Sequence, residues 1–150
     1  MTEKTDSHAC SSIENVRLIE LDKHSHPKGK LSVVENTSDS NIPFAVRRVF
    51  YLYDVPADSE RGGHSHFLGE ELIVAVAGAF EVELDDGVKR KRWRLDRPFR
   101  GLYVPRGLWR VIDNFSGGAV CMVLTSTEFD EGDYVRQYEQ FLTLTENKRK

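Results

Sequence analysis

Two histidines separated by one residue are the strongest chemical signal in this sequence, and they lie in the run Arg61-Gly62-Gly63-His64-Ser65-His66. In a β-strand, side chains two positions apart project from the same face, so His64 and His66 would present two imidazoles to one space. Imidazole ionises near neutral pH, with an ordinary pKa of about 6.5, and it also binds metal ions. The spacing therefore predicts either a metal site or a proton-transfer site.

A second histidine pair, His24 and His26, has the same spacing in a different setting. Pro27, Lys28 and Gly29 follow it directly and predict a turn. Because such connecting segments run over the surface, we expect this pair to lie in a solvated loop without a site.

Arginines beside apolar residues form another group of candidates. Arg48 shares one face of a predicted strand with Phe50 and Leu52. An arginine among apolar neighbours is costly unless it meets an anion, so Arg48 either pairs with Glu71 or binds a phosphate group. The same two interpretations apply to Arg61, which precedes two flexible glycines.

The elements that must hold these residues are mostly short strands. Short apolar runs alternate with turn residues, which is typical of an all-β domain. The expected strands cover residues 16–21, 31–35, 46–55, 64–68, 72–84, 88–95 and 119–125. In the longest run, one face is expected to carry Leu72, Val74, Val76, Phe80, Val82 and Leu84.

One helix is expected, near the C-terminus. Asp130 can cap it, and Tyr134, Gln137, Tyr138 and Phe141 recur at helical spacing. Many short strands and one terminal helix predict an all-β fold of the jelly-roll β-barrel type with one short C-terminal helix.

Composition limits the classes of protein to which the chain can belong. Its 150 residues predict a single domain at 13–145, between a flexible leader at 1–12 and a frayed tail at 146–150. The formal net charge of −3 argues against a nucleic-acid partner. There is no apolar run of the ~18 residues that a membrane span needs, and the start lacks a secretory signal, so we expect a cytoplasmic protein. Cys10 and Cys121 form no C-x-x-C motif and suit a reducing compartment.

The histidine pair also resembles part of a known motif. Glu71 follows His66 after four residues and Gly78 follows Glu71 after six, a spacing similar to the first motif of the cupin superfamily. The segment 101–114 resembles the second cupin motif. In that superfamily, two histidines and a glutamate often hold a metal ion. The resemblance implies a cupin-type jelly roll.

Arg110 argues against a metal ion here. Metal-binding cupins have their last histidine where this sequence has Arg110, and a guanidinium is cationic and has no lone pair to donate. We therefore expect no metal, although His64, His66 and Glu71 with water in the other positions would be enough to hold one.

A longer ordered set of segments extends over about residues 14–142. It consists of Ile42-Pro43-Phe44, Arg48-Val49-Phe50-Tyr51, Arg61–His66, Leu84-Asp85-Asp86-Gly87, Gly101–Pro105, Trp109 and Phe129–Tyr138. This set is similar to the nucleotide-sugar 3,4-ketoisomerases of bacterial deoxysugar pathways, the WxcM-like cupins. The resemblance implies a metal-free homodimer with exchanged N-terminal strands. It also implies conversion of dTDP-4-keto-6-deoxyglucose to a dTDP-3-keto-6-deoxyhexose without a cofactor.

The resemblance and the side-chain chemistry together give the expected roles. His64 would carry a proton between C3 and C4 of the hexose through an enediol, and His66 would relay protons among the sugar oxygens or hold the enediolate. Arg61 would stabilise negative charge on oxygen, and Arg48 would bind the pyrophosphate. The aromatic residues expected to contact the substrate are Tyr51, Tyr103 and Trp109.

Two residues depart from the pattern of that family. Phe50 stands where a tyrosine is expected, which removes one hydroxyl contact to the substrate. Glu71 is a carboxylate where metal-free members can carry an uncharged amide, and we expect it to pair with an arginine or to orient His66.

Other functions stay open at this level. A nucleotide-sugar 3,5-epimerase-like cupin would use a histidine base and a tyrosine acid, for which Tyr51 or Tyr53 is available. A non-catalytic cupin would bind a nucleotide sugar without exchanging any ring proton. A metal-dependent cupin oxygenase is disfavoured because Arg110 replaces a ligand.

Overall fold

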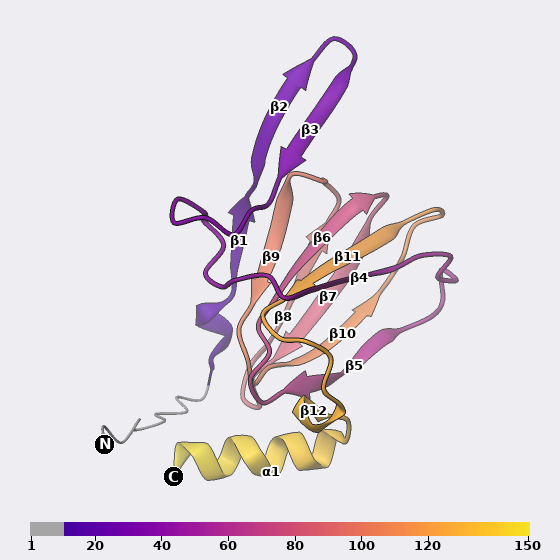
Figure 1. The fold of residues 1–150 in the computed structure, drawn as a ribbon. Helices are drawn as coiled ribbons and strands as arrows, with labels where there is room; N and C mark the ends of the chain where they lie inside the picture. The colour runs from indigo at the N-terminus through magenta and orange to yellow at the C-terminus, as the bar shows by residue number, and fades with distance from the viewer. Residues whose placement is uncertain (1–10) are drawn as a thin grey trace.

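The computed structural model describes residues 11–150, and its main body consists of two five-stranded antiparallel sheets (Figure 1). The first sheet has the order β1 (Arg17–Glu20), β9 (Arg100–Val104), β6 (Glu71–Ala77), β11 (Val120–Thr125) and β4 (Arg48–Leu52). The second has the order β12 (Tyr134–Val135), β5 (Arg61–His66), β10 (Trp109–Asp113), β7 (Phe80–Asp85) and β8 (Arg90–Leu95). From β4 onward, each connection between consecutive strands passes from one sheet to the other, except the hairpin from β7 to β8, which stays in the second sheet. The predicted all-β jelly-roll fold is confirmed.

The main core fills the space between the two sheets. Alternate residues of each strand point inward, as the period of two requires. The largest of these buried side chains are Ile73, Phe80, Leu84, Leu102, Leu108 and Val123. A short 3-10 helix, Ile13–Asn15, is joined to this body by a hydrogen bond from the backbone N–H of Ile13 to the Asp86 carboxylate.

Strand β6 is buried on both faces, because the segment 34–46 covers the outer face of the first sheet. Leu72 and Val74 pack outward under this segment, against Ile42 and Phe44. The expectation that residues 72–84 form one alternating face was therefore wrong. The chain turns at Gly78, where φ is +63°. Of the six residues predicted to share the face, Phe80, Val82 and Leu84 after the turn point inward, whereas Leu72 and Val74 before it point outward. The inward face of β6 begins with Glu71, which is why this carboxylate is buried.

Strands β2 (Asp22–His26) and β3 (Gly29–Val33) form a hairpin that projects from the main body (Figure 1). Every residue of β2 and the first four of β3 are exposed. His24 and His26 lie in β2, within a strand and not in the turn that the sequence predicted. Their predicted exposure to solvent is confirmed.

The C-terminal helix α1 extends from Tyr138 to Arg149, later in the chain than the sequence predicted. Asp130 caps a 3-10 helix, Glu131–Asp133, and β12 follows it. Residues 134–135 become a strand because they pair with β5 and so satisfy their backbone groups. The helix continues past residue 145, and the Arg149 guanidinium donates to the backbone oxygen of Asp86 at 2.7 Å.

The boundaries predicted for the ends of the chain were a leader at 1–12 and a tail at 146–150. Residues 1–10 of the leader lie outside the described residues. In the described part of the chain, no helix is both long enough and apolar enough to cross a membrane.

Candidate active site

Strand β5 contains a β-bulge that brings Arg61 and His64 to the same cavity. Arg110 lies opposite His64 and Ile112 lies opposite Arg61, so the two residues between Arg61 and His64 face one residue of β10. Gly62 has a φ of +88°, in the left-handed region that a residue without Cβ adopts with little strain. This extra residue turns Arg61 toward the cavity that His64 also borders.

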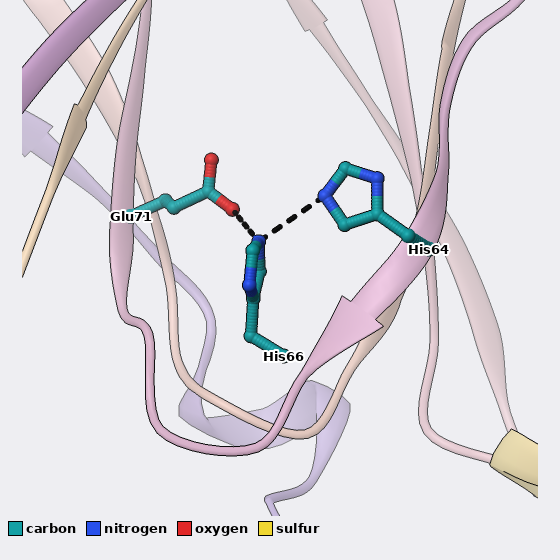
Figure 2. A group of neighbouring side chains, drawn as sticks. All are labelled: His64, His66 and Glu71. Atoms are coloured by element: carbon teal, nitrogen blue, oxygen red, sulfur yellow. Dashed lines mark hydrogen bonds and ion pairs between the residues drawn. The ribbon is translucent and has the colours of Figure 1, made fainter. Parts of the chain in front are cut away.

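His64, His66 and Glu71 converge on one point inside the barrel (Figure 2). The Nε2 atoms of the two histidines are 3.1 Å apart, and their rings meet edge to face at 85°. Nε2 of His66 is also 3.0 Å from Oε1 of Glu71. A proton can therefore pass between the three side chains along short contacts.

Asp133 holds the other side of the His66 ring. Its carboxylate accepts hydrogen bonds from the backbone N–H groups of Leu68, at 2.7 Å, and Gly69, at 3.1 Å. One oxygen is also 3.1 Å from Nδ1 of His66. The Asp133 carboxylate accepts both backbone hydrogen bonds, and we treat it as the acceptor toward His66 as well. The proton shared between Asp133 and His66 is therefore assigned to Nδ1 of the imidazole. This assignment leaves Nε2 of His66 facing His64 and Glu71.

Arg110 forms an ion pair with Glu71 in the interior. Its side chain is only 1% exposed, and one terminal nitrogen contacts Oε1 of Glu71, the oxygen that also faces His66. Burial lowers the pKa of Arg110 from 12.5 to about 9, while Tyr134 and Asp133 act in the opposite direction. Arg110 therefore stays cationic at neutral pH and balances the Glu71 carboxylate.

Both histidines are held in their neutral form. Burial, followed by the charges of Arg110, Arg136 and Arg48, lowers the pKa of His64 from 6.5 to about 3. Burial and Arg110 also lower the pKa of His66 far below its ordinary value. A neutral imidazole can accept a proton, so at neutral pH His64 is available as a base.

A cavity of about 180 Å³ opens beside His64. Its lining residues come from strands of both sheets and from the segment after β12. They are Phe50, Leu52, Arg61, Gly62, His64, Glu71, Arg110, Ile112, Val123, Tyr134 and Arg136. The cavity thus combines apolar walls with His64 and three arginines, which suits an anionic ligand.

Four of the residues predicted from the sequence lie together: Arg48, Arg61, His64 and His66. Arg48 reaches the cavity wall, where its guanidinium donates to the Tyr134 hydroxyl at 3.4 Å. The carboxylate of Glu71 contacts Arg110 and His66, not Arg48. The sequence expectation that Glu71 pairs with an arginine or orients His66 is confirmed, since it does both.

The three predicted aromatic contacts lie outside this cavity. Tyr51 is 61% exposed on the outer side of β4, and Tyr103 packs against Phe44 in the outer cluster while its hydroxyl donates to Glu70. Trp109 packs on the helix, with its ring 5.7 Å from that of Phe141. Any contact of these three residues with a ligand stays a prediction.

Sequence reasoning missed the roles of Asp133, Tyr134 and Arg136 in this site. The alternation of Tyr134 and Arg136 around one apolar residue was the available signal, since it gives both side chains to one strand face. The sequence analysis instead assigned Tyr134 to the predicted C-terminal helix, which in the structure begins only at Tyr138. Nothing in the sequence pairs Asp133 with a histidine 67 positions away.

The same residues can be tested as a metal site. The donor atoms of His64, His66 and Glu71 all lie within 4.8 Å of one another, as three metal ligands do. Arg110, however, contacts the carboxylate that would serve as the third ligand, and it brings a positive charge without a lone pair. The set therefore does not fit a divalent ion that needs this carboxylate.

The two facing sheets and the histidine-lined cavity between them define a cupin-type protein. The chain matches the family described as "FdtA: WxcM-like, C-terminal" over residues 14–146, and it belongs to that family. It is 38% identical to the TDP-4-oxo-6-deoxy-alpha-D-glucose-3,4-oxoisomerase of Aneurinibacillus thermoaerophilus over 125 residues, which are 83% of this chain and 88% of the relative.

Solved structures agree with this family. The sugar 3,4-ketoisomerase QdtA from Thermoanaerobacterium thermosaccharolyticum, in complex with TDP, is 32% identical with a TM-score of 0.86, over 91% of this chain and 98% of that one. A histidine-to-asparagine variant of the same enzyme, in complex with TDP-4-keto-6-deoxyglucose, is 31% identical with a TM-score of 0.86, over 91% of this chain and 97% of that one.

Proposed function

We propose that this chain is a sugar 3,4-ketoisomerase that converts TDP-4-keto-6-deoxyglucose to a TDP-linked 3-keto-6-deoxyhexose. The observation that carries this proposal is the pair of buried, neutral histidines beside a cavity rich in arginine. The family and the named activity of its relatives supply the substrate class.

His64 is the proposed base of the reaction. The ketone at C4 acidifies the hydrogen on C3, and a neutral imidazole can remove it to form an enediol. The same imidazole then returns a proton to C4, which completes the shift of the carbonyl group. Because burial and the nearby arginines lower the pKa of His64, its ring is unprotonated at neutral pH and has a free nitrogen lone pair for this step.

His66 is the proposed relay beside that base. Its Nε2 carries no proton in the assigned tautomer, so it can accept one through its contact with His64 and let protons move among the sugar oxygens. Once protonated there, it could hold the enediolate by donating a hydrogen bond. Asp133 would act through His66 by fixing the proton on Nδ1. Asp133 is thus a positioning residue in this proposal.

The arginines of the cavity are the proposed anion contacts. Arg61 borders the cavity, and we assign it to the negative charge that develops on the sugar oxygen. Arg48 carries a fork of donors that matches phosphate oxygens, and we assign it to the pyrophosphate. Its Nε is buried and has no hydrogen-bond partner in the described part of the chain, which supports a ligand contact.

We also propose that the enzyme is a homodimer with exchanged N-terminal strands. An isolated two-stranded hairpin is marginally stable in water, yet β2 and β3 pack no face against their own chain. Leu31 is 57% exposed on this hairpin. A second copy of the chain that covers the hairpin would bury this surface. Cytoplasmic location stays a prediction from the sequence.

Proton exchange in deuterated water tests the activity. We expect the wild-type protein to turn TDP-4-keto-6-deoxyglucose into a 3-keto product with deuterium at C4, followed by NMR. Label at C3 and C5 with retention of the 4-keto group would instead indicate a 3,5-epimerase. Tight binding without exchange at any ring carbon would indicate a binding protein.

The variant His64→Asn tests the assignment of the base. We expect kcat to fall by about 100-fold or more, because positioned acid–base groups contribute this much, while TDP-sugar binding persists. Exposed His26→Asn is the matched control and should keep wild-type turnover. Turnover of His64→Asn near the wild-type rate would remove His64 from this role.

A further inference from the structure

Tyr134 lines the reaction cavity together with His64 and packs against both histidines, and its position follows from strand pairing. In the register of β12 and β5, Tyr134 lies directly opposite His66. Paired residues of antiparallel strands project from the same face, so the phenol ring enters the space that the imidazoles occupy. Its ring centroid is 4.4 Å from that of His66 and 4.9 Å from that of His64.

The Tyr134 hydroxyl is free to donate to a ligand. Its oxygen accepts a hydrogen bond from the Arg48 guanidinium at 3.4 Å, and no acceptor for its own proton is found among residues 11–150. The Arg136 guanidinium lies 4.3 Å from the ring centroid, on the face of the ring.

Among the residues that the structure describes, Tyr134 is the cavity-lining residue whose side chain carries a hydroxyl. The facing strand β4 presents Phe50, whose ring has no polar atom, and the remaining lining residues are aliphatic, acidic, basic or glycine. Enolisation of a ketone needs a proton donor at the carbonyl oxygen while a base removes the neighbouring C–H proton. The arginines of the cavity can hold negative charge on that oxygen by donating hydrogen bonds, and the hydroxyl of Tyr134 offers a proton that can be returned in the second half of the reaction.

We propose that Tyr134 is the catalytic acid of the isomerisation, an assignment that rests on the proposed function. As His64 removes the proton from C3, the C–H electron pair forms the C3–C4 double bond. The π electrons of the C4 carbonyl move to its oxygen, which takes the proton of Tyr134. When the enediol collapses, C4 takes the proton held by His64. The proton that leaves the C3 hydroxyl returns to the Tyr134 oxygen, so the phenol and the imidazole are both restored.

The variant Tyr134→Phe is the direct test, because it keeps the ring against both histidines and removes only the hydroxyl. We expect kcat to fall by about 100-fold, with KM changed by less than about threefold. Exchange of the C3 proton with deuterated solvent should slow to a similar extent, since C–H cleavage depends on the acid. Tyr53→Phe, at a residue that is 62% exposed, is the matched control and should keep the wild-type rates.

Each result of this comparison decides the assignment. If the wild-type protein is active and the kcat of Tyr134→Phe is within threefold of the wild-type value, Tyr134 is not the catalytic acid. The proposed function then still stands. If Tyr134→Phe binds TDP more weakly and also unfolds at a lower urea concentration than the wild type, the hydroxyl has a structural role. This result also overturns the proposal. If the wild-type protein itself produces no 3-keto sugar, the proposed function fails, and the assignment of Tyr134 fails with it.

Discussion

Four ionisable side chains contact one another in a row inside the barrel: Arg110, Glu71, His66 and Asp133. Burial of each group is costly alone, and the neighbour of opposite charge or the hydrogen-bond partner offsets that cost. Two backbone N–H groups fix Asp133 at one end, and β10 fixes Arg110 at the other. His66 therefore cannot rotate without breaking contacts on both sides, so its ring is already oriented before substrate binds.

The buried histidines make the stability of the fold depend on pH. The pKa of His64 is about 3 in the folded protein and about 6.5 in the unfolded chain, so the unfolded chain binds this proton more readily between these values. The stability from His64 is complete above pH ~6.5 and declines as the pH falls toward 3, by up to about 1.4 kcal/mol per pH unit. His66, whose pKa is also lowered, acts in the same direction.

Urea unfolding at pH about 7.5 and about 5 checks this sign. We expect the wild-type protein to lose more stability between the two pH values than His64→Asn does, because the variant lacks one of the groups that the unfolded chain protonates. His24→Asn, which removes an exposed imidazole, should keep the wild-type difference. Equal losses in the wild type and in His64→Asn would contradict the origin of the effect.

Arg110 leads to a second prediction at this scale, on metal removal. Its positive charge contacts the carboxylate that a divalent ion would need, so we expect a chelator to leave kcat unchanged. Dialysis against EDTA, followed by turnover and by elemental analysis of the protein, provides the measurement. Loss of activity that one particular divalent ion restores would show that His64, His66 and Glu71 hold a metal despite Arg110.

At the scale of elements, the bulge in β5 sets the direction of Arg61. Because Gly62 has a φ of +88°, alanine at this position would strain the backbone by about 1–3 kcal/mol or straighten the strand. We expect Gly62→Ala to lower the free energy of unfolding by about that amount and to reduce turnover, since Arg61 would leave the cavity. Gly117→Ala is the control, at a glycine without a positive φ and with open space where a Cβ would lie. Unchanged turnover in Gly62→Ala would show that the bulge does not position Arg61.

The strands could be predicted from the sequence because alternation is a local signal. The period of two placed Arg48 and Phe50 on one face of a strand and placed His64 beside His66. The structure has both pairs so, and it shows that the face with Phe50 is the inner one. The same rule failed at residues 72–84, where Gly78 ends one strand and the next belongs to the other sheet. A change of sheet is a property of the whole fold, and local periodicity does not contain it.

The C-terminal segment shows why the rest of the site was not predictable. Tyr134, Tyr138 and Phe141 have spacing close to that of a helix, yet Tyr134 belongs to a strand because β5 offers it hydrogen-bond partners. Those partners are nearly 70 positions earlier in the chain. The contact between Asp133 and His66 depends on this long-range pairing, so side chains that orient the histidines were invisible to a local analysis.

At the scale of the whole molecule, the site depends on both sheets. His64 and Arg110 come from the second sheet, whereas Phe50 and Glu71 come from the first, and the cavity lies where the two sheets face each other. The segment 34–46 forms a further layer over the first sheet and buries the outer face of β6. Glu71 lies on the opposite, inner face of β6, where it lines the cavity.

The projecting hairpin connects the architecture of one chain to its proposed assembly. Strands β2 and β3 lie away from both sheets (Figure 1), and only Val33 among their residues is even partly buried. Exposed apolar surface on an element that lies away from the core of its own chain indicates a contact with another chain. We therefore expect the wild-type protein to be a dimer by light scattering after size exclusion, because a second copy buries Leu31 and its neighbours.

Leu31→Glu tests this assembly, since it places a charge where the partner would cover an apolar side chain. We expect this variant to shift toward a monomer as the protein is diluted, with the main body still folded by circular dichroism. Ser32→Glu is the matched control, because adjacent strand residues project from opposite faces, and it should keep the dimer. If the wild-type protein is already a monomer, or if the two variants behave alike, the hairpin does not carry the dimer contact through Leu31. An exchange of strands through this face would then be excluded. The proposed proton-transfer chemistry would remain, because the cavity lies within one chain.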